Sequence, residues 1–290
     1  MTGVQTCALP IYRNTMPFTI DGKLRSGVFE LEGDVSSQYV TGLLFALPLL
    51  DGDSEIRMLS KLESKPYVDL TIACLRHFGI AVQETEQGYA VAGGQQYHAC
   101  DLTVEGDYSQ AAFFCVANAL GSDITLTNLN PESVQGDKKI VEIVREMCYN
   151  REQGLPAGFT VDAADIPDLV PILAVLATFG TAPSSITGAH RLAIKESDRL
   201  ASTADLLNRL GGKVTATPDG LEIEPVEHLH GGTVDSCGDH RIAMCAAVAA
   251  TRCAGEVTIL HGECVEKSYP RFYEDYRQLG GIANVIVLES

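Results

Sequence analysis

The feature that most constrains the fold of this 290-residue chain is a weak internal repeat. Four times, a loop containing aspartate leads into about ten mostly apolar residues and then into a short β-prone segment. The loops lie at residues 33–38, 106–110, 165–168 and 238–241, the apolar runs at 40–50, 111–120, 170–179 and 242–251, and the β-prone segments at 55–58, 123–126, 185–186 and 256–259. Apolar runs of this kind predict buried helices. Each unit therefore begins as a loop, a buried helix and a strand.

A second helix and a β-hairpin complete the pattern in two units. Amphipathic helices are predicted at 67–78 and 202–210, each followed by a glycine that can end it. Short alternating segments come next, at 80–82, 89–91, 214–216 and 221–223. The sequence Thr-Pro-Asp-Gly at 217–220 is a turn signal between the last two. The complete unit is then βαβαββ-like. In the second unit the hairpin is missing, and residues 149–158 are predicted to form a loop in its place. The alternative is coincidental spacing of ordinary α/β elements.

Composition excludes several classes of function. With a formal net charge of −17, the chain has no Lys/Arg-rich stripe to neutralise nucleic-acid phosphates, whereas small anions need only a few focused cations. The nine cysteines contain no CxxC pair and are odd in number, which predicts buried free thiols in a reducing cytoplasm rather than disulfides or a metal site. No apolar run is long enough to cross a membrane, so no membrane partner is expected.

Two segments concentrate cations beside carboxylates. They are Lys195-Glu196-Ser197-Asp198-Arg199 and Asp239-His240-Arg241, and each is predicted to start a helix. On one helix, Lys195, Glu196 and Arg199 could all face a single site, because Lys195 lies four residues and Glu196 three residues before Arg199. A helix N-terminus also attracts phosphates and carboxylates. The two segments therefore indicate an anion site, with ordinary surface ion pairs as the alternative.

These segments belong to six ordered signatures, and together they resemble the 5-enolpyruvylshikimate-3-phosphate synthase family (3-phosphoshikimate 1-carboxyvinyltransferases). The resemblance covers about residues 17–282, and the other four signatures are Gly33-Asp34-Val35-Ser36-Ser37-Gln38, Ser64-Lys65-Pro66-Tyr67, Asp165-Ile166-Pro167-Asp168 and Lys267-Ser268-Tyr269-Pro270. The resemblance implies an α/β (α+β) enolpyruvyl transferase fold, an inside-out α/β barrel of repeated βαβαββ units in two domains with the substrates in the cleft between them.

The resemblance also implies an activity, in which the enolpyruvyl group of phosphoenolpyruvate moves to the 5-hydroxyl of 3-phosphoshikimate and phosphate leaves. This is a step of the shikimate pathway to chorismate and the aromatic amino acids, and the family uses no metal or organic cofactor. The implied 3-phosphoshikimate contacts are Ser36, Ser37, Gln38, Ser64, Tyr67, Asp168 and Lys195. The implied phosphoenolpyruvate contacts are Gln38, Arg199, Arg241 and Lys267. Asp168 would be the base for the 5-hydroxyl and Glu196 the acid that protonates the methylene carbon.

Several of these residues also have simpler interpretations. Asp168 and the Ser36-Ser37 pair could be helix caps, and Glu196 could pair with Arg199 on an exposed face. We interpret His240 as a structural histidine and not as a base. We expect Asp239 to orient Arg241 through an ion pair.

The N-terminal region is expected to be incomplete. Residues 1–16 are interpreted as a non-native leader, 17–103 as the remaining unit of a first domain, and 104–290 as a second domain of three units. Family members carry further substrate loops upstream. We therefore expect this chain alone to be inactive or nearly so and to expose apolar faces that other units would cover, and the full-length form to be a monomer.

Two rival functions stay open. One is the related transferase that acts on UDP-N-acetylglucosamine, which depends on a reactive cysteine in a loop that this chain would lack. The other is a non-catalytic anion-binding relic of the fold, whose hallmark would be loss of Asp168, Glu196 or Lys267. All three residues are present.

Overall fold

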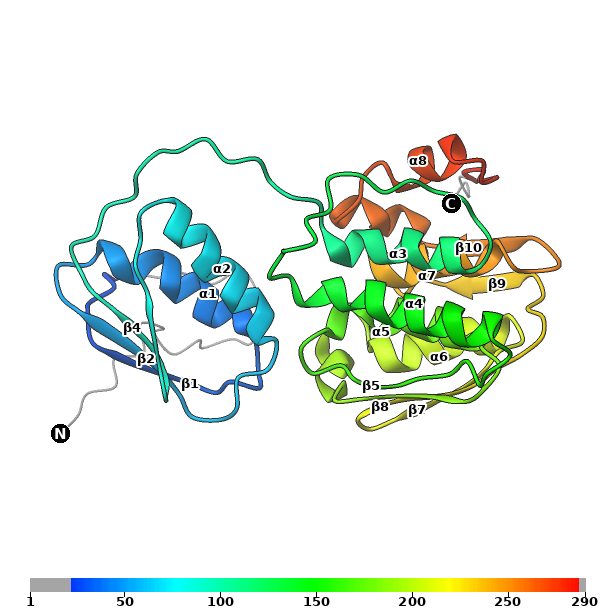
Figure 1. Cartoon of the computed structure of the whole chain (residues 1–290), viewed down its shortest axis with the longest axis horizontal. Coiled ribbons are helices and arrows are strands. Elements are labelled where there is room, and N and C mark those ends of the chain that lie inside the picture. The colour runs from blue at the N-terminus through cyan, green and yellow to red at the C-terminus, as the bar shows by residue number, and fades with distance from the viewer. Residues whose placement is uncertain (1–21, 287–290) are drawn as a thin grey trace. The chain divides into compact units, whose positions relative to one another are not determined.

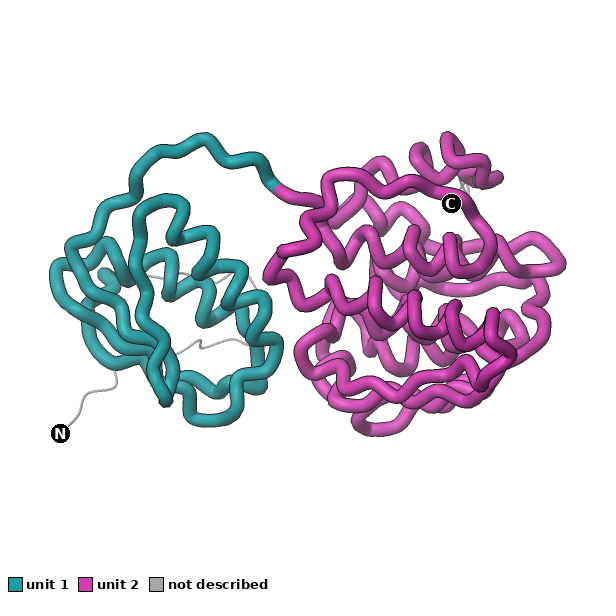
Figure 2. Tube along the Cα trace, in the orientation of Figure 1, with its two compact units in different colours: residues 1–104 teal, residues 105–290 magenta. Residues whose placement is uncertain are grey.

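The computed structural model describes residues 22–286, so the predicted leader at 1–16 lies outside the described residues. The chain divides into two compact units, one ending at Val104 and the other beginning at Glu105 (Figure 2). The interpretation of the first unit as the remainder of a larger domain stays a prediction.

From residue 22 on, the first unit contains a four-stranded sheet, two α-helices and a short 3₁₀ helix (Figure 1). Its elements are β1 (Val28–Leu31), α1 (Ser37–Ala46), the short 3₁₀ helix η1 (Leu47–Leu49), β2 (Ser54–Met58), α2 (Lys65–His77), β3 (Gln83–Thr85) and β4 (Gly88–Val91). The strand order is β1-β2-β4-β3. β1 runs parallel to β2, and β4 is antiparallel to both of its neighbours. The predicted βαβαββ unit is therefore confirmed here.

The core of this unit lies between the sheet and the two helices. Val40 and Leu44 of α1 meet Val68 and Leu75 of α2, and all four side chains are buried. One predicted strand is wrong: residues 80–82 form no strand, and the hairpin begins at Gln83. The apolar alternation there reflects packing of the turn after α2, in which the side chain of Ile80 is buried against the core.

The second unit contains the remaining repeats. Its elements are α3 (Tyr108–Ala119), η2 (Gly136–Lys138), α4 (Lys139–Glu152), β5 (Thr160–Asp162), η3 (Pro167–Leu169), α5 (Val170–Thr178), β6 (Ser184–Thr187), η4 (His190–Ile194), α6 (Arg199–Arg209), β7 (Lys213–Thr217), β8 (Gly220–Glu224), β9 (Gly232–Asp235), α7 (His240–Ala250), β10 (Val257–Leu260), η5 (Gly262–Lys267) and α8 (Phe272–Gln278). One sheet has the order β5-β6-β8-β7, and β9 pairs with β10 in parallel. The predicted hairpin around residues 217–220 is confirmed as β7–β8.

Three inner helices form the core of the second unit. α3, α5 and α7 pack against one another, and every residue of α5 is buried. α4 covers α3, and α6 packs on both α5 and α7 (Figure 1). These inner helices are the apolar runs of the sequence repeat, so the prediction that they are buried is confirmed.

Two elements of the second unit differ from the prediction. No strand forms at residues 123–126, where the side-chain amide of Asn118 binds both backbone groups of Ile124. Asn208 binds Val214 in the same way, and Val214 lies within β7 and pairs with β8, so the residues at 123–126 differ in having no partner strand beside them in the described structure. The predicted loop at 149–158 begins only after Glu152, because α4 continues through its first residues.

The eight cysteines between residues 22 and 286 are all free thiols. Only Cys245 is buried, whereas Cys100 and Cys237 are exposed and the other five are partly exposed. The prediction of buried thiols is therefore wrong for most of these positions, and Cys100, Cys237 and Cys253 lie on no helix at all. No helix in the described part of the chain combines the length and apolar character that a membrane span requires.

Candidate anion-binding and acid–base site

The start of α7 is built around Asp239. Its carboxylate caps the helix by accepting a hydrogen bond from the backbone N–H of Arg241 at 2.9 Å, and its side chain has no solvent exposure. The same carboxylate accepts hydrogen bonds from Nε of Arg199 at 2.7 Å and from the Ser197 hydroxyl at 3.2 Å. The expectation that Asp239 orients the Arg241 guanidinium was therefore wrong, because Asp239 holds the guanidinium of Arg199.

The start of α6 also differs from the prediction. The helix begins at Arg199 and not at Lys195, because Asp198 is the N-cap and accepts a hydrogen bond from the N–H of Ala201 at 3.1 Å. Lys195 has an extended backbone (φ −85°, ψ −156°), and Glu196 lies in the loop that follows. Glu196 and Arg199 still face each other, although the predicted helical spacing does not bring them together.

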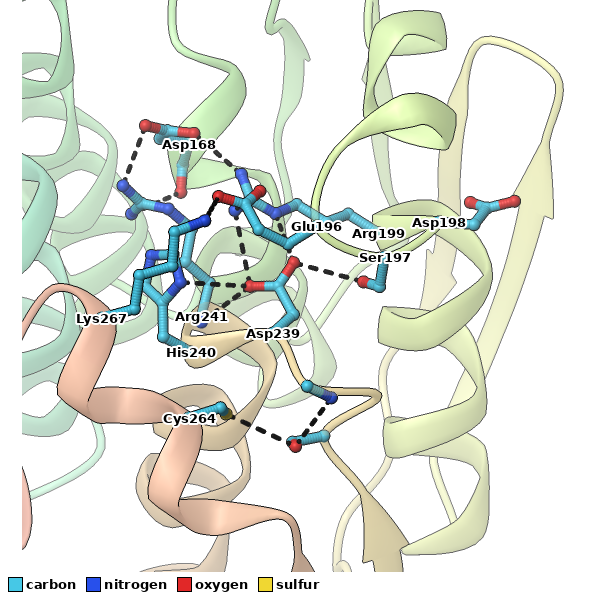
Figure 3. A network of polar contacts seen from close by, with 12 residues as sticks. Asp168, Glu196, Ser197, Asp198, Arg199, Asp239, His240, Arg241, Cys264 and Lys267 are labelled. Atoms are coloured by element: carbon cyan, nitrogen blue, oxygen red, sulfur yellow. Dashed lines mark hydrogen bonds and ion pairs between the residues drawn. The ribbon is translucent and has the colours of Figure 1, made fainter. Parts of the chain in front are cut away.

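Arg199 is the centre of the cluster, because its side chain is only 2% exposed and contacts three carboxylates (Figure 3). Besides Asp239, it donates to Asp168 Oδ1 at 2.9 Å and to Glu196 Oε2 at 2.7 Å. Burial alone would lower the pKa of Arg199, but its hydrogen bonds and the charges of the three carboxylates raise it. The guanidinium is therefore fixed and charged at any pH at which the protein is folded.

Asp168 joins α6 and α7 through their arginines. One carboxylate oxygen faces Arg199, and the other accepts from Arg241 Nη2 at 2.8 Å, while the Asp168 carbonyl accepts from Arg241 Nη1 at 3.3 Å. Its side chain is not a helix cap, since it makes no capping hydrogen bond at the start of η3 or α5. Burial favours a higher pKa for Asp168, but Arg241, Arg199 and Lys195 outweigh it and lower the pKa.

Glu196 bridges the buried arginine and an outer lysine. Oε2 faces Arg199, and Oε1 accepts from Nζ of Lys267, at the end of η5. Burial raises its pKa, but the hydrogen bond from Lys267 and the charge of Arg199 lower it to about 2. The Glu196 side chain is 26% exposed and that of Lys267 56%, so this pair forms the outer side of the cluster.

Two further groups complete the cluster. His240 is buried, and both burial and the Arg241 charge lower its pKa, so it is neutral at pH 7. This agrees with a structural histidine. Lys195 is exposed and forms no ion pair with another residue between 22 and 286, but its charge lowers the pKa of Asp168. Loss of hydration is the largest cause that lowers the pKa of Lys195 itself.

The balance of charge favours an anionic ligand. Four cations and three carboxylates give an excess of one positive charge, in a chain whose formal net charge is −17; they are Lys195, Arg199, Arg241, Lys267, Asp168, Glu196 and Asp239. The start of α7 adds the positive end of a helix dipole. Positive potential concentrated in this way attracts phosphates and carboxylates.

In the first unit, the predicted 3-phosphoshikimate contacts lie at two adjoining helix starts. Ser36 caps α1 by accepting from the N–H of Gln38 at 3.3 Å, which confirms the capping interpretation for Ser36, and Ser37 is the first residue of the helix. Ser64 precedes α2, in whose first turn Tyr67 lies.

Backbone contacts join the two loops that precede these helices. Gly33 donates to the Ser60 hydroxyl at 2.8 Å, and a Cβ at Gly33 would lie 2.7 Å from the carbonyl oxygens of Ser60 and Lys61. Glycine at this position therefore lets the two helix starts lie together.

Sequence reasoning missed the residues that support the cluster from behind. The Ser197 hydroxyl binds Asp239, and the Ser236 hydroxyl accepts from the N–H of Gly238 at 3.2 Å and donates to the carbonyl of His261 at 3.1 Å. Ser236 therefore connects the loop that carries Asp239 to the segment that carries Lys267. In the sequence, the one feature that could have pointed to Ser236 is its position two residues before Gly238-Asp239, where the fourth repeat begins.

Comparison with known proteins identifies the family. Residues 10–276 match the family described as EPSP synthase (3-phosphoshikimate 1-carboxyvinyltransferase). The chain belongs to the EPSP synthase family. It is 46% identical over 276 residues to the 3-phosphoshikimate 1-carboxyvinyltransferase of Clostridium kluyveri and 44% identical to that of Clostridium novyi. The matches cover 92% and 93% of this chain but only 65% and 64% of those relatives, so the chain spans about two thirds of their length.

Solved structures agree with the family assignment. An EPSP synthase from Acinetobacter baumannii matches with a TM-score of 0.73 and 26% identity, over 89% of this chain and 63% of that one. The enolpyruvyl transferase NikO from Streptomyces tendae matches with a TM-score of 0.64 at 18% identity, which shows the fold alone. The predicted enolpyruvyl transferase fold is thereby confirmed.

Proposed function

We propose that this chain carries the acid–base centre and most of the anion contacts of a transferase that moves the enolpyruvyl group of phosphoenolpyruvate to 3-phosphoshikimate and releases phosphate. The observation that carries this proposal is the single hydrogen-bonded network of Asp168, Glu196, Arg199, Arg241 and Lys267. Such an addition and elimination needs two carboxyl groups for proton transfer and several cations for an anionic substrate, and the network contains both.

We assign the substrate-binding and proton-transfer roles to individual residues of this network. Lys267 lies on the outer side of the network and Arg241 is buried beside Asp168. Both would bind the phosphate and carboxylate of phosphoenolpyruvate together with Arg199. Asp168 would accept the proton of the 5-hydroxyl, because the cations around it keep it ionised at pH 7. Glu196 is ionised in this network, so it would first take up a proton from water and then donate it to the methylene carbon.

The first unit would supply the contacts to 3-phosphoshikimate. Hydroxyls and backbone N–H groups at the starts of α1 and α2 suit a phosphate, since they donate without bringing a competing negative charge. We assign this role to Ser36, Ser37, Gln38 and Ser64, with Tyr67 beside the ring and Lys195 as a further cation. We also infer that the protein is cytoplasmic, because its described cysteines are free thiols.

The test is a phosphate-release assay with phosphoenolpyruvate and 3-phosphoshikimate. We expect the 290-residue chain alone to show no turnover, and a fusion that adds the unmatched third of the Clostridium kluyveri relative to restore it. In that fusion, Asp168→Asn should lower kcat by at least about 100-fold, the size expected for loss of a general base. Serine at Cys237, an exposed position outside the network, is the matched control and should leave kcat unchanged.

Two results would contradict the proposal. The first is a folded fusion that binds phosphoenolpyruvate but never releases phosphate, which would favour the non-catalytic relic. The second is preferential turnover with UDP-N-acetylglucosamine as acceptor.

A further inference from the structure

Arg241 and Lys267 are each already paired with one of the two carboxylates proposed for proton transfer. Arg241 donates to the Asp168 carboxylate through Nη2 and to its carbonyl through Nη1, and Lys267 donates to Glu196 (Figure 3). Each cation has further N–H donors, but a phosphate bound to them places negative charge beside Asp168 and Glu196, which are themselves anions. The phosphate therefore competes with these two carboxylates for the charge and the position of Arg241 and Lys267.

The network divides into a fixed and an exchangeable part. Arg199 and Asp239 are 2% and 0% exposed, and two hydrogen bonds join them, so separating them would leave a buried charge unpaired. Lys267 and Glu196 are partly exposed, and water can replace each partner at little cost. Arg241 is between these extremes, because its own side chain is 8% exposed while Asp168 is 24% exposed.

We propose that an anion enters this site by ion-pair exchange, taking Lys267 from Glu196 and Arg241 from Asp168 while the Arg199–Asp239 pair stays in place. The exchange itself rests on the contacts above. The identity of the anion as phosphoenolpyruvate rests on the proposed function.

The exchange links anion binding to proton transfer. Glu196 faces Lys267, Arg199 and His240, and with Lys267 in place its pKa is about 2, too low for an acid at neutral pH. Transfer of Lys267 to the anion removes the hydrogen bond that lowers this pKa most, so the pKa rises. Asp168 faces Arg241, Arg199 and Lys195, and loss of Arg241 likewise raises its pKa and its basicity. The carboxylates therefore become competent for proton transfer when the anion arrives.

The decisive experiment is a double-mutant cycle on the binding of inorganic phosphate to the full chain, measured by calorimetry. If Glu196 competes for Lys267, Glu196→Gln should bind phosphate about five-fold more tightly than the wild type, the factor that corresponds to release of a partly exposed ion pair. In a Lys267→Met background the same substitution should change the affinity by less than about two-fold, because the contested cation is gone.

A matched control separates exchange from a general effect of charge. Asp198→Asn also removes one negative charge from the same loop, but Asp198 lies apart from the network and asparagine preserves its helix cap (Figure 3). It should change phosphate affinity by less than about two-fold at physiological salt. Equal tightening by Glu196→Gln and Asp198→Asn, or tightening by Glu196→Gln that persists in the Lys267→Met background, would overturn the exchange.

A measurement on the wild type covers the case in which a variant fails to fold. The carboxyl ¹³C resonance of Glu196 should titrate at a higher pH in saturating phosphate than in its absence, and an unchanged midpoint would refute the proposal. Repeating the cycle with phosphoenolpyruvate separates the two hypotheses. If phosphate shows the exchange but phosphoenolpyruvate binds no better than phosphate, the exchange stands and the proposed function fails.

Discussion

The inner helices of the two units have the same place in the sequence repeat but different surroundings. α5 is buried along its whole length between α3 and α7, whereas Tyr39 and Phe45 of α1 are 58% and 45% exposed. Each helix is mostly apolar, so the apolar run alone does not decide how much of a helix is covered. The number of packed neighbours decides it, and among the described residues of its unit α1 packs against α2 and the short η1.

The N-termini of the inner helices are also more exposed in the first unit than in the second. α1 begins with a serine cap on a partly exposed loop, while α7 begins with Asp239, whose buried carboxylate is shared with Arg199. A dense helical core can hold charges away from water only when each is paired, and the second unit meets that condition. The first unit therefore suits neutral contacts to a phosphate, and the second suits charged groups that react.

The largest stability effect is expected at the buried ion pair. Asp239→Ala would leave Arg199 buried without its main partner and should lower the free energy of unfolding of the second unit by about 3–5 kcal/mol. Urea unfolding followed by circular dichroism, with hydrogen exchange in α7, measures this. Asp205→Ala, which breaks the exposed pair with Arg209, is the control and should cost less than about 1 kcal/mol. Similar losses in both variants would show that the network is not a buried unit.

The second largest loss of stability is expected in the inner helix α5, and a much smaller one in α1. Leu173→Ala in α5 opens a cavity at a fully buried position and should cost about 2–5 kcal/mol. Phe45→Ala in α1 removes a larger side chain from a position that is nearly half exposed, and we expect a change within about 1 kcal/mol. Hydrogen exchange in the two helices assigns each loss to its unit. A large loss at Phe45 would mean that the α1 face is covered in solution.

A smaller effect is expected at the α1 cap. Ser36→Ala removes the side-chain acceptor for the N–H of Gln38 and should lower the stability of the first unit by about 1 kcal/mol, while Ser36→Asp keeps the cap. If the hydroxyl also binds a phosphate, Ser36→Asp should abolish that binding through charge repulsion although stability is retained. Equal stability of the alanine variant and the wild type would show that the cap contributes nothing.

Sequence alone predicted the repeat, the inner helices and the β7–β8 hairpin, because apolar periodicity and turn residues act locally. It did not predict which carboxylate binds which cation. Helical spacing suggested a helix from Lys195, but the Asp198 cap starts α6 four residues later. Asp239 binds the guanidinium of Arg199, forty residues away in sequence, and not the guanidinium of Arg241, since the packing of α6 on α7 decides that contact. Residues 123–126 have the composition of a strand, but no strand pairs with them in the described structure, and local composition does not decide whether a partner strand is present.

The pH dependence of stability gives the smallest and most specific prediction. The pKa of Glu196 is lowered to about 2 in the folded protein, below its value near 4.3 in an unfolded chain. Ionised Glu196 therefore stabilises the fold above about pH 4.3, and this contribution is lost as the pH falls through about 2. Because a quarter of the side chain is exposed, screening by water reduces the contribution to about 1 kcal/mol.

Glu196→Gln should remove this contribution. The difference in free energy of unfolding between wild type and variant should then shrink between about pH 4.5 and pH 2, and Lys267→Met should show the same trend because it removes the other half of the pair. Urea unfolding at four or five pH values in that range measures both. Parallel curves for the wild type and Glu196→Gln would mean that Lys267 does not hold Glu196 in solution, which would also remove the basis for ion-pair exchange at this carboxylate.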